Sequence, residues 1–152
     1  MVDGLTHISM LYHKFQYHRT SIARFPFVFP FRPLTLLTSH RSPVRSLSYW
    51  HRPHTSRTKL PIVFIHGIGI GLWPYVNFLA SLNHDADEGS DGDVGVIAIE
   101  ILPVSFRIMG AALSREDMCR HIQTILLHHG FEKFVLVAHS YVICSRDPKS
   151  PS

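Results

Sequence analysis

Residues 61–71 read Pro-Ile-Val-Phe-Ile-His-Gly-Ile-Gly-Ile-Gly, an apolar run that passes directly into alternating glycines. The β-branched and aromatic run Ile62–Ile65 is typical of a parallel strand buried on both faces. The glycines predict a tight turn, and a helix is expected to begin near Trp73, because Pro74 is tolerated in a first helical turn. The segment therefore predicts a strand, a turn and a helix in succession, which is how a parallel α/β sheet is built.

Two more apolar runs and a second helical pattern continue this alternation. Val94–Ile99 and Phe134–Ala138 predict two further buried strands. Between them, Ser114 is expected to cap a helix that ends where Gly130 takes a left-handed backbone conformation. The buried stripe of that helix is expected to comprise Met118, Ile122, Ile125 and Leu126.

The length of 152 residues, with 45% hydrophobic and 17% charged residues, fits one globular domain. Residues 1–45 lack a sustained period and contain repeated prolines, so they are predicted to form a basic, aromatic-rich and largely irregular extension. Residues 46–142 are predicted to form the α/β core, with Leu47–Arg52 as a fourth strand on the edge side, and residues 143–152 a disordered tail. The expected fold class is α/β, a partial three-layer α/β/α sandwich around a mostly parallel sheet.

Charge is distributed unevenly along the chain. Residues 1–60 carry nine Lys/Arg and one acid, a net charge of +8, whereas residues 61–152 carry six against ten, or −4, which together give +4. No apolar run approaches the roughly 18 residues of a membrane span. The sequence predicts a cytoplasmic protein without a nucleic-acid partner. The basic segment also allows a mitochondrial location or association with a membrane surface.

Two motifs at predicted strand ends carry the candidate chemistry. Ser140 follows the strand Phe134–Ala138, where a sharp strand-to-helix turn would expose its hydroxyl above the sheet. Alone, this serine is equally well explained as the cap of the next element. His66–Gly69 follows another strand, and its glycines would let backbone N–H groups face a developing oxyanion, although an isolated glycine turn is more often only a turn. Together, the two motifs predict an acyl-transfer site.

Three segments also carry a family resemblance: the stretch 61–71, the Ile-Ala-Ile-Glu strand and the Val-Leu-Val-Ala-His-Ser-Tyr strand end. Over residues 45–141 the chain resembles the α/β-hydrolase fold family of serine esterases and lipases, and is similar in particular to uncharacterised fungal hydrolases. The resemblance implies a carboxylic ester hydrolase with a small-molecule ester substrate and no cofactor. It assigns the nucleophile to Ser140, the oxyanion hole to the backbone N–H groups of Ile68 and Tyr141, and the oxyanion loop to His66, Gly67 and Gly69, with His66 structural rather than basic.

The sequence departs from the family pattern after the serine. Val142 stands where the family has glycine, Asp147 is the only acid past Ser140, and no histidine follows. The family places its acid and histidine after the nucleophile. The chain is therefore expected to be a truncated, N-terminal part of a hydrolase without measurable esterase activity. Such a non-catalytic product would expose the serine strand as an unpaired apolar edge, which invites self-association or aggregation.

Two other site types use overlapping residues. Gly67–Gly71 between a strand and a helix, with Glu100 at the end of the next strand, would fit a dinucleotide-binding βαβ module. Against that alternative, Leu72 stands where the pattern has glycine. A metal site on the helix, built from His121 and the pair His128–His129, is disfavoured because adjacent helical residues diverge by about 100°. No metal site is therefore predicted.

Overall fold

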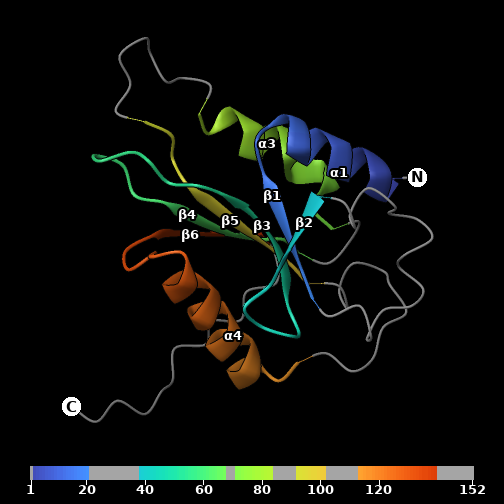
Figure 1. Cartoon of the computed structure of the whole chain (residues 1–152), viewed down its shortest axis with the longest axis vertical. Coiled ribbons are helices and arrows are strands. Elements are labelled where there is room, and N and C mark those ends of the chain that lie inside the picture. The colour runs from blue at the N-terminus through green and yellow to red at the C-terminus, as the bar shows by residue number, and fades with distance from the viewer. Residues whose placement is uncertain (1, 21–37, 68–70, 84–91, 102–112, 140–152) are drawn as a thin grey trace.

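In the described part of the chain, a helix and four strands come first, and helices and strands alternate after the fourth strand. The computed structural model describes residues 2–20, 38–67, 71–83, 92–101 and 113–139 (Figure 1). In chain order, its elements are α1 (Val2–Tyr12), β1 (Gln16–Arg19), β2 (Ser39–Arg41), β3 (Ser48–Arg52), β4 (Ile62–Ile65), the short 3-10 helix η3 (Trp73–Tyr75), α3 (Val76–Ser81), β5 (Val96–Glu100), α4 (Arg115–His128) and β6 (Val135–Ala138).

The strands form one six-stranded mixed sheet in the order β2-β1-β3-β5-β4-β6. β4 is parallel to both of its neighbours, β5 and β6, and β1 is parallel to β2. β3 is antiparallel to both β1 and β5. The α/β class predicted from the sequence is confirmed, with a sheet that is mostly parallel.

Helices cover both faces of this sheet (Figure 1). On one face, Met10 of α1 and Leu79 of α3 share a buried cluster with Phe64 of β4. On the other face, Ile125 of α4 shares a second cluster with Ile65 of β4. Consecutive β4 residues thus point to opposite, equally covered faces, which explains why the run that encodes this strand is apolar without interruption.

Helix α4 confirms its predicted start, end and buried stripe. Ser114 caps the helix, its Oγ accepting a hydrogen bond from the Asp117 backbone N–H at 3.1 Å. Gly130 has a φ of 71°, in the left-handed region expected just past a helix end. Of the predicted stripe, two residues are buried and two pack partly buried against the same cluster: Ile125 and Leu126, and Met118 and Ile122.

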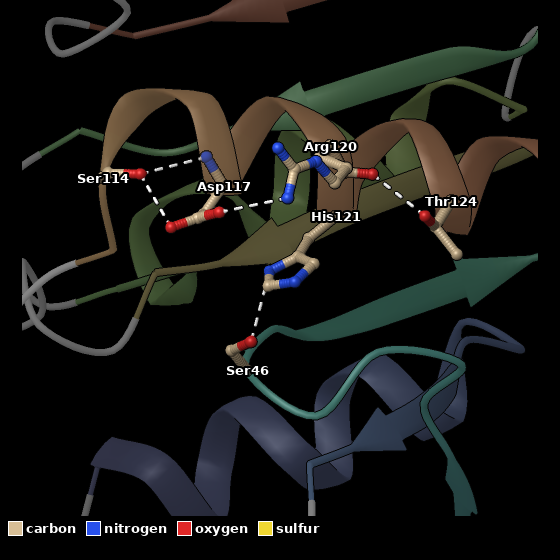
Figure 2. A network of polar contacts seen from close by, with 6 residues as sticks. All are labelled: Ser46, Ser114, Asp117, Arg120, His121 and Thr124. Carbon is tan, nitrogen blue, oxygen red and sulfur yellow. Dashed lines mark hydrogen bonds and ion pairs between the residues drawn. The ribbon is translucent and has the colours of Figure 1, made fainter.

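A polar network runs along α4 and ties it to the sheet (Figure 2). The Asp117 carboxylate accepts a hydrogen bond from Ser114 Oγ at 2.8 Å and lies 3.5 Å from the exposed Arg120 guanidinium, an ion pair of small energetic value. His121 Nδ1 lies 3.1 Å from Ser46 Oγ, in the loop before β3. This histidine is therefore engaged in holding α4 to the β3 side of the fold.

The structure contradicts two predictions, the edge position of the strand Leu47–Arg52 and the burial of the strand Phe134–Ala138. Leu47–Arg52 does form a strand, but β3 lies between β1 and β5 and all five of its residues are buried, so its predicted place at the edge is wrong. Conversely, β6 pairs with β4 alone among the described strands. Val135 and Leu136 are each 46% exposed, so the expectation of a buried third strand is wrong and the expected unpaired apolar edge is confirmed within the described residues.

The prediction of a largely irregular extension over residues 1–45 is wrong for its described part, which forms α1, β1 and β2. α1 escapes a hydrophobic-period search because Thr6 and His7 face the interior while Leu5 and Ile8 are about half exposed. Strand β1 reads Gln-Tyr-His-Arg, a polar segment that nonetheless carries buried residues. The core therefore begins well before residue 46.

Some sequence expectations fall on residues outside the described ranges. These are the disordered tail at 143–152 and the site residues Ile68, Gly69, Ser140 and Tyr141. Within the described ranges, no helix has the length and apolar character needed to cross a bilayer.

Candidate functional site

The carboxyl ends of β4 and β6 lie side by side. The two strands are parallel and in register, with Ile65 opposite Ala138. The His139 N–H donates to the Ile65 carbonyl at 3.1 Å, so the pairing continues one residue beyond β6. The sequence-predicted loop at His66 and Gly67 therefore begins beside the residue that precedes Ser140.

The chain changes direction in the sheet between these same two strands. From β4 it crosses through η3 and α3 to β5 on one side, and from β5 it crosses through α4 to β6 on the other. The helices of the two crossovers cover opposite faces (Figure 1). Open α/β sheets bind ligands at such a switch point, outside the carboxyl ends of the strands. The β4–β6 end is thus the expected ligand site of this topology.

The His66 side chain links the end of β4 to the end of β5 by a hydrogen bond. The side chain is fully buried. The backbone N–H of Ile101, the residue after β5, donates to His66 Nε2 at 3.0 Å, so that nitrogen carries the lone pair and Nδ1 carries the proton. Nδ1 in turn donates to the Gly67 carbonyl at 2.7 Å. With both ring nitrogens engaged in positioning backbone, His66 is suited to shaping the loop and not to removing a proton.

His139 is also engaged, on the α3 face of the sheet. Its Nδ1 lies 2.8 Å from the hydroxyl of Tyr75 in η3, and the two rings are 5.5 Å apart. Tyr75 itself packs against Phe64 of β4. The histidine next to Ser140 in sequence is therefore held toward the first crossover, across the end of β4.

Glu100 is placed where the dinucleotide alternative cannot use it. Its side chain is 4% exposed, and its carboxylate accepts a hydrogen bond from the Tyr17 hydroxyl at 3.0 Å. A ribose-binding acid has to reach the open end of the sheet. Tyr17 lies on β1, a strand that the sequence did not predict.

A second polar cluster, missed by sequence reasoning, lies on the α4 face of the sheet. His18 of β1, His51 of β3 and His129 at the end of α4 each bring a ring nitrogen within 4.8 Å of the others. The rings of His51 and His129 stack with their centroids 3.8 Å apart. Of the three, the sequence singled out only His129, because β1 was not predicted and nothing in the sequence indicates that β1, β3 and α4 meet at this point.

Burial and mutual repulsion hold these histidines neutral. Burial first, and then the neighbouring His129, lower the pKa of His18 to about 4 and that of His51 to about 3. The pKa of His129 falls to about 4, through burial and then the adjacent His128. His40, which stacks on His18, and His128 lower the pKa values of His18 and His51 further, while the Arg41 backbone raises the pKa of His18.

The free energy of unfolding is expected to fall as the pH is lowered from about 7 toward 4. The unfolded chain takes up a proton on each histidine near pH 6.5, whereas the folded chain does so only near 3 to 4, so the unfolded state binds more protons in between. The histidines therefore leave stability unchanged above pH 6.5, and stability falls as the pH is lowered from there toward their folded pKa values of about 3 to 4. Urea unfolding in buffer with chelator measures the slope. Replacing His18 and His51 together by phenylalanine should flatten it, and an unchanged slope would contradict the assignment.

No protein-family model, curated protein or solved structure matches this chain.

Proposed function

We propose that the β4–β6 strand ends form the nucleophile and oxyanion side of a serine hydrolase site for small carboxylic esters. In this proposal Ser140 attacks the ester carbonyl. The backbone N–H groups of Ile68 and Tyr141 stabilise the oxyanion that forms. The fold is then the α/β/α sandwich of an α/β-hydrolase, of which the mixed sheet with helices on both faces is the described part.

The observation that carries the proposal is the parallel pairing of β4 with β6. It brings the His66–Gly67 loop alongside His139, the residue that precedes Ser140 in the sequence. A nucleophile elbow needs this neighbourhood, because its oxyanion hole combines the N–H after the nucleophile with one from the loop after the neighbouring strand. The topological switch at the same point supports the proposal too, because open α/β sheets bind their ligands at such a point.

The two described histidines nearest to the proposed site are both engaged in hydrogen bonds. The lone pair of His66 accepts from the Ile101 N–H, and His139 is bonded to Tyr75. Serine attack needs an adjacent base to take the hydroxyl proton. The 152-residue polypeptide is therefore expected to react at Ser140 slowly and stoichiometrically, without turning over an ester such as p-nitrophenyl butyrate.

The test is whether an alkyl fluorophosphonate labels Ser140 in preference to the other serines of the chain. Intact-mass analysis counts the labels, and peptide mapping locates them. Preferential labelling of Ser140, lost in Ser140→Ala, supports the proposal. Labelling spread evenly over exposed serines, with no preference for Ser140, counts against it.

We also propose that β6 drives self-association of the chain. Val135 and Leu136 are each 46% exposed on a strand whose outer side has no partner among the described residues. Exposed apolar edge strands pair with other chains unless a charge prevents it. Leu136→Lys is expected to shift the chain from oligomer toward monomer in sedimentation velocity. The matched exposed position Leu127→Lys on α4 should leave the distribution unchanged. Equal effects of the two would contradict an edge-specific contact.

A further inference from the structure

The α4 face of the sheet carries a histidine cluster that the hydrolase proposal does not use. β1, β3 and the end of α4 contribute His18, His51 and His129, which are more than 100 residues apart at their extremes in sequence. His18 sits opposite Tyr49 in the β1–β3 pairing, and strand alternation places His51 on the same face as Tyr49. His129, at the C-terminal end of α4, lies beside these two histidines. The topology, and not local sequence, brings the three rings together.

Several ring nitrogens of this cluster lack a hydrogen-bond partner among the described residues. Both ring nitrogens of His18 and Nδ1 of His51 are buried without a hydrogen bond of ordinary geometry among the described residues. Buried polar atoms without partners are rare, because each costs about 1–3 kcal/mol. Apolar side chains would fill the same space at no such cost. Unpartnered nitrogens from two separate strands, converging on one point, indicate a group that they hold in common.

We propose that His18, His51 and His129 bind a single divalent transition-metal cation of the zinc class. Neutral imidazole nitrogens are preferred ligands of such ions, and three of them with one open position is an established coordination set for zinc. Zn–N distances of about 2.0–2.1 Å place tetrahedral ligand nitrogens about 3.4 Å apart. The present separations, within 4.8 Å, exceed that value by up to about 1.4 Å, so the rings have to turn toward one another for all three nitrogens to bind one ion.

The surroundings of the cluster suit this ligand set. Metal-bound histidines usually have their second ring nitrogen fixed by another group. Tyr49 provides that group for His129, since its hydroxyl lies 2.8 Å from Nε2, which leaves Nδ1 for the ion.

An approach to the cluster is present in the structure. A cavity of about 540 Å³ is lined by His51 and His129, together with Pro53, His54 and Phe131. It borders two of the three proposed ligands. Two further lining residues, Pro61 and Lys133, precede β4 and β6, so the cavity lies at the amino ends of these strands, opposite to the proposed esterase site. An ion there would cross-link β1, β3 and α4 without taking part in ester chemistry.

Equilibrium dialysis of the chelator-stripped full chain against Zn²⁺ tests the proposal. One tight Zn²⁺ per chain is expected, with binding weakened at least tenfold in His18→Phe and in His51→Phe. The matched control is His121→Gln, which removes an α4 histidine bonded to Ser46 and not to the cluster. Circular dichroism and metal-free melting establish that each variant folds, and phenylalanine is expected to be tolerated because it removes buried unpartnered nitrogens.

Cobalt(II) titration of the unmodified chain gives an independent result if a variant does not fold. Saturation of visible d–d absorption at one equivalent, reversed by Zn²⁺, supports the site. The proposal is overturned if the absorption does not saturate at one equivalent, or if both cluster variants bind Zn²⁺ as tightly as His121→Gln. Neither outcome bears on labelling of Ser140, so the two proposals fail separately.

Discussion

Ser140→Ala is expected to abolish the one selective reaction of the chain, its slow modification by a fluorophosphonate. An oxyanion hole and substrate binding retain about 10³–10⁴-fold rate enhancement over water when a member of the catalytic triad is removed. Ser140 should therefore be labelled about a thousandfold faster than serines on exposed surfaces. Time courses of intact mass, with peptide mapping of the adduct, measure that ratio.

The size of this effect depends on the oxyanion loop and not only on the hydroxyl. One lost oxyanion donor typically costs about 10²–10³ in rate. Gly69→Pro, which distorts the loop after β4 without touching Ser140, is expected to slow labelling by such a factor. Ser114→Ala serves as the control, because it removes a serine that only caps α4. Identical labelling rates in Gly69→Pro and in the unmodified chain would argue that the loop and the serine act independently.

Gly95→Ala is expected to produce a large loss of stability. A Cβ at Gly95 would clash with His54 Cβ and would lie 2.7 Å from His54 Cα, so the backbone has to move. The same residue accepts a hydrogen bond from the Ile62 N–H at 2.8 Å, at the start of β4, and donates to His54 Nδ1 at 3.0 Å. Overpacking of this kind costs about 1–3 kcal/mol, and here we expect the upper end. Thermal and urea unfolding measure it.

Gly4→Ala provides the opposite control in the same assay. Gly4 lies within α1 and has no atom within 4 Å of the added methyl group. Alanine in a helix interior is favoured over glycine by about 0.5–1 kcal/mol, so this variant is expected to be more stable. If α1 were instead an irregular extension, Gly4→Ala would leave the unfolding midpoint unchanged. If Gly95→Ala left the unfolding midpoint unchanged, that result would contradict the close approach of residues 54 and 95.

The central α/β unit could be predicted from the sequence because its elements obey simple periods. Ile62–Ile65 is an apolar run buried from both sides, and α4 carries its cap, stripe and terminal glycine at the expected positions. The place of β3 inside the sheet could not be predicted, because pairing partners far along the chain decide it. Its buried His51 and Arg52 look like residues of an exposed edge.

Helix α1 and the histidine cluster show why local sequence patterns fail to predict some features of the fold. α1 buries Thr6 and His7 and exposes Ile8, so tertiary contacts override its hydrophobic period. The histidine cluster could not be predicted from local sequence, because its members lie close together only when β1, β3 and α4 are assembled. For the proposed esterase site the sequence identified the motifs, and the structure adds the adjacency of β4 and β6 that their cooperation requires.

A disulfide test measures most directly whether residue 68 faces residue 140 across these neighbouring strand ends. In a chain with Cys119→Ser and Cys144→Ser, the pair Ile68→Cys and Ser140→Cys is oxidised and the loss of free thiols is counted. Disulfides form only between Cα atoms about 4.4–6.8 Å apart. Rapid closure is predicted, while the control pair Ile68→Cys and Thr124→Cys, with its second position on the exposed side of α4, remains reduced. A 68–140 pair that closes no faster than the control would contradict the account.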